Sequence, residues 1–199
     1  MVLVSIVVLA SCSSGSSAAK GSSTTRAPRS ATVTATAGLV GVVSAGKPVE
    51  LSPADRTAVL RAVDTYVRAA TIEPLAGRPA KLDALFAKDA APAVGAPERD
   101  ALSDDGLPKV TGDAKATLVP VSMSGLADQS GAVDLVGTTL DLTVTATAAR
   151  GAITIHRSGE LMFVRDGGSW KILSFKLAVT RDGAGLGPAP SSTTGSTTP

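Results

Sequence analysis

The spacing of the apolar residues changes at Gly112, and this change restricts the chain to folds that combine helices with a sheet. Before Gly112, apolar residues recur every three or four positions, which is typical of helices that bury one face. After Gly112 they alternate with polar residues, which is typical of strands with one buried face. Helical segments followed by strands predict an α+β domain built on an antiparallel sheet.

The helical part opens with a segment that carries both a start signal and a stop signal. Ser52 suits the N-cap position and Pro53 the first helical position. Residues 74–77, which contain Pro and Gly, are expected to end this helix. A second, shorter helix is expected over residues 80–88. The apolar stripe of the first helix consists of Val59, Val63, Val67 and Ala70.

Strand candidates fill the alternating part of the chain. Pro120 confines the first candidate to an edge or a bulge, because proline has no amide hydrogen to donate. The alternation slips at Leu173 and Ser174 in the last candidate, which is typical of a β-bulge that bends a strand. Residues 165–169 have the composition of a hairpin loop. The prediction is a curved sheet of about four strands, over residues 114–123, 132–148, 151–164 and 170–179.

Two low-complexity segments flank this unit. Residues 12–46 are mostly Ser, Thr, Gly and Ala, and residues 183–199 contain no charged side chain. Such compositions bury little apolar surface, so we predict a disordered tether and a disordered tail around one domain, residues 47–182. Every acidic residue lies from Glu50 onward, which makes the domain mildly acidic and the tether basic.

The first residues have the pattern of a secretion signal. Residues 2–10 form an apolar run that is too short for a membrane-spanning helix, which needs about 20 residues. Residues 9–12 read Leu-Ala-Ser-Cys and resemble the lipobox of bacterial lipoproteins, a branched residue and two small residues before a Cys. The resemblance implies that residues 1–11 are a signal peptide, cut between Ser11 and Cys12, and that the Cys12 sulfur receives a diacylglyceryl group.

A lipid on Cys12 would decide where the protein resides. Each buried methylene contributes about 0.8 kcal/mol, so two acyl chains hold a protein to a bilayer where one does not. We therefore expect membrane anchoring on the outer face of a bacterial cell membrane. Residues 2–11 contain neither Lys nor Arg, so a basic opening is expected upstream. The alternative is a small buried Cys behind an apolar start.

The end of the domain carries a second resemblance. Residues 159–161 (GEL), 166–172 (DGGSWKI) and 179–182 (VTRD) resemble the end of nuclear transport factor 2-like domains, and residues 85–87 (LFA) fit the same pattern. The chain is similar in particular to actinobacterial lipoproteins that have this domain and no assigned activity. The resemblance spans most of residues 52–182. It implies a cone in which the helices pack inside a strongly curved sheet, as in SnoaL-like and other cystatin-like α+β folds, around a pocket.

Some members of that superfamily are isomerases or cyclases, whose chemistry depends on an acid or a His on the inner face of the cone. Asp141 and His156 are the candidates here. Both alternate with core residues, so we expect them to face away from the cavity. A slip of one residue in the register would reverse this expectation. The candidate residues that line the pocket are Tyr66, Phe86, Leu142, Phe163, Trp170 and Phe175. For Tyr66 the alternative is a core residue whose hydroxyl is hydrogen bonded within the protein.

Composition excludes several kinds of chemistry. One Cys and one His are too few for a zinc site built from these ligands, and no metal is expected. A net charge of +2 without a basic patch gives no reason to expect nucleic acid. The chain contains no Asn, so it lacks the Ser-Asp-Asn motif of penicillin-interacting enzymes. No cofactor is expected and no catalytic residue is assigned.

Three functions remain open. The preferred one is a non-catalytic interaction or accessory module that binds a protein of the cell envelope. The second is a carrier that holds a lipid or another small hydrophobic ligand in the cone cavity, and the third is a cavity enzyme of isomerase or cyclase type. A ligand site normally combines an apolar wall with a few polar groups. The predicted inner face is apolar throughout, which favours the interaction module over the carrier.

Overall fold

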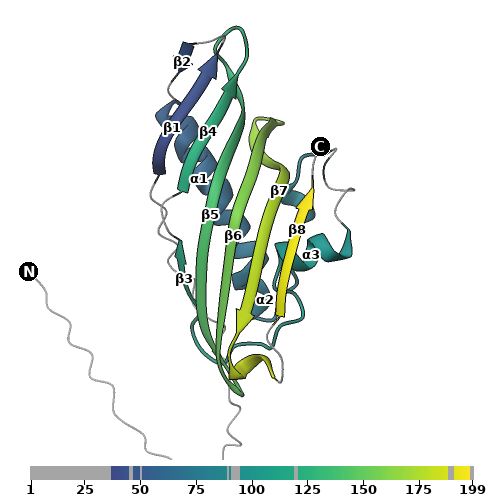
Figure 1. The fold of residues 1–199 in the computed structure, drawn as a ribbon. Helices are drawn as coiled ribbons and strands as arrows, with labels where there is room; N and C mark the ends of the chain where they lie inside the picture. Colours follow the sequence, from purple (N-terminus) through teal and green to yellow (C-terminus); the bar gives the residue numbers. More distant parts are fainter. Residues whose placement is uncertain are drawn as a thin grey trace, which may run out of the picture.

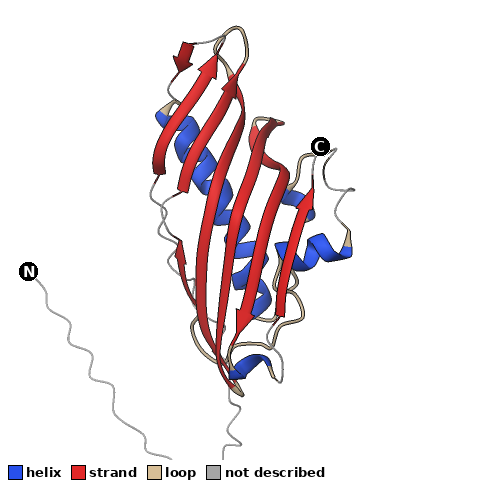
Figure 2. Ribbon diagram, in the orientation of Figure 1, coloured by secondary structure: helices blue, strands red, loops and turns tan. Residues whose placement is uncertain are grey.

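Helices cover one face of an eight-stranded, curved sheet in the computed structural model of the protein (Figures 1 and 2). The predicted α+β class is therefore confirmed. Ser11, Cys12 and the whole predicted signal peptide lie outside the described residues. No helix in the described part of the chain has the length and apolar character needed to cross a membrane. The structure describes residues 37–44, 47–49, 51–88, 90, 95–118, 121–187 and 191–197.

Helix α1 (Pro53–Val67) begins where the sequence predicts. The Ser52 hydroxyl accepts a hydrogen bond from the Asp55 amide at 3.0 Å, which is the expected N-cap contact. The helix then continues through a π-helical segment, η1 (Arg68–Ile72), into α2 (Glu73–Leu75). The helical run ends at Leu75, within residues 74–77 as predicted, and Pro74 lies in its last turn.

The second predicted helix does not form. The prediction of a helix over residues 80–88 is wrong, because only a 3-10 turn, η2 (Asp83–Leu85), forms there. Phe86 leaves this turn in an extended conformation and forms a bridge with Ile172, so a contact with the sheet replaces a further helical turn. Helix α3 (Ala96–Leu102) lies beside the last strands, and a 3-10 turn, η4 (Ala184–Leu186), follows the sheet (Figure 1).

The sheet has the strand order β2-β1-β4-β5-β6-β7-β8, and β3 also pairs with β5. The pairing of β1 with β4 is parallel and the others are antiparallel. The expected number of about four strands is wrong, partly because the candidate over residues 114–123 forms two strands. The strands are β1 (Ala37–Ser44), β2 (Lys47–Val49), β3 (Lys115–Leu118), β4 (Val121–Ala127), β5 (Val133–Ala148), β6 (Gly151–Asp166), β7 (Ser169–Asp182) and β8 (Ser191–Thr197).

The sheet also extends beyond the predicted domain, residues 47–182. Strand β1 lies within the segment expected to be tether, and β8 lies within the segment expected to be tail. Strand β8 consists only of Ser, Thr and Gly, yet it pairs with β7 from Phe175 to Arg181. Backbone amides and carbonyls form these pairings, so a strand of this composition leaves no apolar signal in the sequence.

The predicted bend and hairpin are both confirmed in the β6–β7 pair. Met162 pairs with Ser174 and Phe163 with Ile172, which leaves Leu173 as the additional residue of a β-bulge. Gly167 and Gly168 join the two strands with φ angles of 57° and 80°. Both angles lie in the left-handed region, which a two-residue hairpin turn of this type requires and which glycine adopts without strain.

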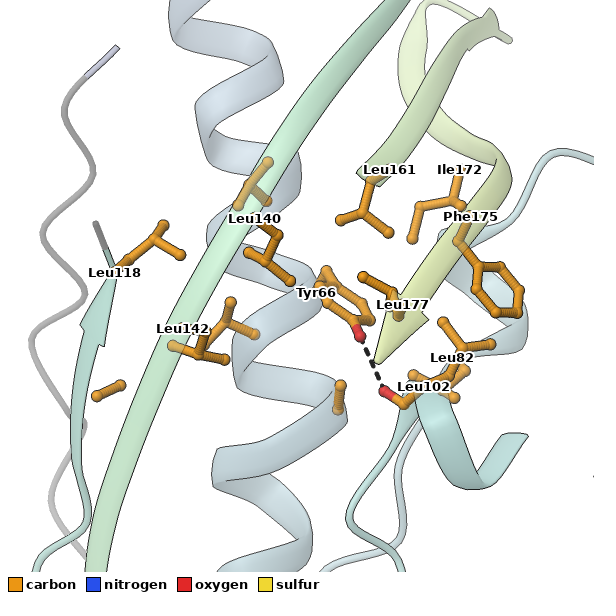
Figure 3. Packing of buried hydrophobic residues seen from close by; sticks show 14 of the residues in the cluster. Tyr66, Leu82, Leu102, Leu118, Leu140, Leu142, Leu161, Ile172, Phe175 and Leu177 are labelled. Atoms are coloured by element: carbon orange, nitrogen blue, oxygen red, sulfur yellow. Dashed lines mark hydrogen bonds between the residues drawn. The ribbon is translucent and has the colours of Figure 1, made fainter. Parts of the chain in front are cut away.

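The hydrophobic core fills the space between α1 and the covered face of the sheet. Tyr66 lies at its centre, between leucines of β5 and β7 (Figure 3). Phe86 and Phe175 meet edge to face, with ring centroids 6.3 Å apart. The central strands thus bury one face, and their other face has no described helix over it (Figure 2).

Candidate functional site

The structure divides the six predicted pocket residues into two groups. Four of them are packed in the core, and two line a cavity. The four core residues are Tyr66, Phe86, Leu142 and Phe175, and the two cavity residues are Phe163 and Trp170.

The cavity, called here the Trp170 cavity, has a volume of about 180 Å³. Most of its wall is apolar. Lys171 also lines it, and the Lys171 ammonium group donates a hydrogen bond to the carbonyl of Ala84. Three elements form the wall: α1 with Ala62 and Thr65, η2 with Leu85, and the β6–β7 pair with Phe163, Trp170, Lys171 and Ile172.

Trp170 combines two unusual contacts. The guanidinium group of Arg165 lies 4.7 Å from the centroid of the Trp170 ring, and Arg165 also forms an ion pair with Asp55 on α1. The indole N–H of Trp170 is enclosed and has no acceptor among the described residues. An unpaired buried donor costs about 1–3 kcal/mol, and because this N–H is enclosed by protein it does not border the open space of the cavity.

Sequence reasoning missed a cluster of buried charges formed by Arg157, Arg181 and Asp104. The guanidinium groups of Arg157 and Arg181 donate to the two carboxylate oxygens of Asp104, at 2.9 and 2.8 Å. Arg157 also donates to the Thr71 hydroxyl at 2.6 Å, and that hydroxyl donates to Asp104 at 2.7 Å. Thr71 belongs to the π-helical segment η1, so the cluster joins the helical layer to β6 and β7.

The cluster holds the carboxyl end of α3. The last carbonyls of a helix have no partner within the helix. Here Arg157 donates to the carbonyl of Ala101 at 3.1 Å, and the Tyr66 hydroxyl donates to the carbonyl of Leu102 at 3.0 Å (Figure 3). Arg181 donates to the carbonyls of Asp100 and Ser103, at 2.6 and 2.8 Å. The cationic side chains also complement the negative end of the helix dipole.

Burial and charge act in opposite directions on the pKa values of this cluster. Burial by itself raises the pKa of Asp104, but the neighbouring guanidinium groups of Arg157 and Arg181 outweigh it and lower the pKa below its usual value. Burial raises the pKa of Tyr66 to about 12. Asp104 is therefore an anion and Tyr66 a neutral hydrogen-bond donor at neutral pH.

One signal of the cluster was present in the sequence. Arg157 occupies the position on β6 that follows Ile153 and Ile155 on the covered face, and Arg181 likewise follows Leu177 and Val179 on β7. An arginine in phase with core residues needs an internal partner, since an unpaired buried charge is costly. The sequence does not predict that Asp104 is this partner, because Asp104 lies in a loop far from both arginines along the chain.

Asp141 and His156 lie on the uncovered face of the sheet, as predicted from their alternation. The structure brings them together, with His156 Nε2 3.6 Å from a carboxylate oxygen of Asp141. Both side chains are about half exposed, and water screens such a pair strongly. Neither residue faces the Trp170 cavity.

A cluster of apolar residues lies on the same uncovered face, at the end of the sheet where β4 and β5 are joined. Leu126 is 58% exposed and pairs across the strands with Leu135, which in turn pairs with Val164. Met162 lies beside them, opposite Gly137. Leu126, Leu135, Met162 and Val164 together are called the outer-face patch.

A hollow of about 330 Å³ adjoins the outer-face patch. Gly137 has no side chain and leaves open space between its neighbours on β4 and β6. Met162 gives the hollow an apolar side, and the Glu160 carboxylate lies at its edge. The hydroxyls of Ser122 and Thr139 are hydrogen bonded to each other at 2.7 Å on the opposite side.

The described residues contain no group of three or more His, Cys, Asp or Glu side chains able to hold a metal ion. Comparisons of the chain with protein-family models, with curated proteins and with solved structures gave no match. The function is therefore argued from the geometry of the outer-face patch, the Trp170 cavity and the buried charges.

Proposed function

We propose that the protein is a non-catalytic interaction module of the bacterial cell envelope, which binds a partner protein through the outer-face patch. The observation that carries this proposal is the row of Leu126, Leu135 and Val164 across three strands, on a face that no described helix covers. Leu126 is exposed, and Leu135 and Val164 are partly buried. Contiguous exposed apolar surface beside polar groups is typical of protein–protein contact sites.

The hollow at Gly137 gives this surface a means of selecting its partner. Most of the binding energy of an interface comes from a few large side chains that fill pockets on the other protein. A hollow of about 330 Å³ with Met162 on one side receives one such apolar side chain. The Glu160 carboxylate and the nearby hydroxyls would then select a partner with hydrogen-bond donors around that anchor.

The structural role of the buried charged residues favours binding over catalysis as the function of the protein. Arg157, Arg181 and Asp104 are all occupied in holding α3, and Asp141 and His156 lie in the open on the uncovered face. The proposed architecture is the helix-packed cone of the nuclear transport factor 2-like domains. The curvature of the sheet and the position of the helices on one face support it.

The proposed location is the outer face of the cell membrane, with the protein attached through diacylglyceryl-Cys12. The residues that support it are Leu9 to Cys12, in the order expected of a lipobox. A lipid anchor would confine the module to two dimensions, which raises the effective concentration of membrane-bound partners. Weak binding by a small patch is sufficient under that condition.

Site-specific cross-linking in living cells tests the interaction module. The photo-reactive amino acid p-benzoylphenylalanine replaces Leu126 in one strain and Thr145 in another. Thr145 is exposed on the same face but lies at the far end of β5. We expect a discrete cross-linked product from position 126 and none from position 145.

A second variant shows whether the hollow takes part. Gly137→Leu fills the hollow from its floor and should abolish the product from position 126 without changing the thermal unfolding of the purified protein. Products of equal yield from both positions, or no product from position 126, would contradict the proposal. A product with twice the mass of the chain would show that the partner is a second copy of this protein and not another envelope protein.

A carrier function is the second candidate, and the Trp170 cavity is the observation that favours it. Its volume of about 180 Å³ is below the usual range for drug-sized ligands, about 300–1,000 Å³. The cavity thus favours a compact ligand over a lipid with long acyl chains. A cavity enzyme is not proposed, because no charged or His side chain except Lys171 lines this cavity in the described part of the chain.

A further inference from the structure

We propose that the Trp170 cavity binds a compact carboxylate with an aromatic or branched apolar body, and that Lys171 selects the carboxylate. This inference rests on the carrier function, the second of the two functions proposed above, and does not depend on the outer-face patch. Three features of the cavity support it: its size, its walls and its cation.

The size of the cavity sets the size of the apolar body. A cavity of about 150 Å³ lined by Leu, Ile and Phe accommodates a benzene molecule. The Trp170 cavity has about 180 Å³, with Phe163, Ile172 and Leu85 among its wall residues. A single six-membered ring or a short branched chain therefore fits, and an acyl chain of membrane length does not.

Lys171 is the group that would recognise the charge of the ligand. Among the described residues Lys171 forms no ion pair, and its ammonium group donates only to the carbonyl of Ala84. An ammonium group has three donors, so two remain for a ligand. Arg165, the other cation beside Trp170, already pairs with Asp55, which leaves Lys171 as the uncompensated charge of this wall.

The other polar groups of the wall do not compete with Lys171 for the charge of a ligand. The Trp170 N–H is enclosed by protein, and the Thr65 hydroxyl already donates to the carbonyl of Arg61 at 2.7 Å. The ammonium group of Lys171 is therefore the positive charge of this wall. A carboxylate is the small anionic group that complements it, since it accepts hydrogen bonds and donates none.

Trp170 provides a direct measurement, because it is the only Trp in the chain. Its fluorescence reports on the cavity wall without any label. We would titrate the full chain with benzoate and, separately, with benzyl alcohol, a neutral molecule of nearly the same size. Saturation-transfer NMR on the two ligands gives a second measurement that does not depend on fluorescence. Benzoate is expected to bind at least about tenfold more tightly than benzyl alcohol.

Two variants separate the charge of the cavity from its space. Lys171→Met keeps a long side chain and removes the cation, so benzoate affinity should fall about tenfold while benzyl alcohol affinity stays the same. Ala62→Leu fills the cavity from α1 and should abolish binding of both ligands. Lys176→Met, at an exposed position further along β7, is the matched control and should change neither affinity. Circular dichroism and thermal unfolding show that each variant is folded.

The outcomes distinguish the selection of a carboxylate from the carrier function on which it rests. Equal binding of both ligands, unchanged in Lys171→Met, would overturn the selection of a carboxylate and leave the carrier function standing. Binding of neither ligand by the folded chain would overturn the carrier function as well. Binding that persists in folded Ala62→Leu would place the ligand elsewhere and overturn the assignment to this cavity. None of these results bears on the cross-linking test of the outer-face patch.

Discussion

Arg157 donates a hydrogen bond to Asp104 at 2.9 Å, and both side chains are completely buried. The two residues belong to distant parts of the chain, β6 and the loop that follows α3. Desolvation makes a buried ion pair a poor source of net stability, but removal of one partner leaves an uncompensated charge in the core. The pair therefore acts mainly to specify where α3 docks.

Asp104→Asn is expected to lower the free energy of unfolding by about 3–5 kcal/mol, because Arg157 and Arg181 then lose their shared anion. Urea unfolding followed by circular dichroism measures this change. Asp141→Asn, which removes the carboxylate of the exposed Asp141–His156 pair, is the control and should change stability by less than about 1 kcal/mol. Equal effects of the two substitutions would contradict the structural role of Asp104.

The lowered pKa of Asp104 predicts a loss of stability in acid. Its pKa in the folded state lies below the unfolded value of about 3.9. The unfolded chain therefore binds the proton first, and the stabilisation is present above that value and is lost as the pH falls towards the folded pKa. The free energy of unfolding should decline more steeply below about pH 4 in the native protein than in Asp104→Asn. Parallel pH profiles of the two proteins would argue against this.

Tyr66 predicts the opposite dependence in alkali. Its pKa is raised to about 12, above the unfolded value of about 10. Its contribution is fully present below about pH 10 and is lost as the pH rises through the folded pKa. Tyr66 is the only Tyr in the chain, so the ultraviolet absorbance of the phenolate follows its titration alone. A midpoint near pH 10 in the folded protein would show that the hydroxyl is not buried as described.

Tyr66→Phe tests the hydrogen bond itself. The substitution leaves the carbonyl of Leu102 at the end of α3 without its donor, which costs about 1–3 kcal/mol. Denaturant unfolding of the variant and the native protein at neutral pH measures the difference. A variant as stable as the native protein would indicate that water replaces the hydroxyl.

Gly159→Ala is expected to destabilise the β6–β7 pair by at least about 2 kcal/mol. Gly159 has a φ of 141°, and a Cβ there would lie 2.0 Å from the carbonyl oxygen of Lys176. Gly137→Ala is the control, since its Cβ would be 3.4 Å from the nearest atom, the Ser124 hydroxyl oxygen. Thermal unfolding of both variants should show a clear fall in the melting temperature for Gly159→Ala alone.

Cys12→Ala is expected to abolish incorporation of radiolabelled palmitate and to release the protein from the membrane fraction. The reason is that the diacylglyceryl group would be the anchor, at about 0.8 kcal/mol for each buried methylene. Fractionation of cells that express the native and the variant chain measures this. Unchanged membrane retention of the variant would rule out the lipid anchor.

Features that depend on a few adjacent residues were predictable. The start of α1 follows from Ser52 and Pro53, and the hairpin from Gly167 and Gly168. The bulge at Leu173 follows from a break in the alternation. The outward position of Asp141 and His156 follows from the same alternation. Caps, turns and strand periodicity act over a few bonds, so neighbouring side chains contain the whole signal.

The tertiary structure decided what depends on distant partners. The number of strands is one example, because β8 pairs through its backbone and its Ser, Thr and Gly residues do not reveal that pairing. The buried charges are another, since Arg157 is stable in the core only where Asp104 from a remote loop compensates it. The candidate sites follow the same rule. The Trp170 cavity and the outer-face patch each combine residues from several elements, and only the folded chain brings these residues together.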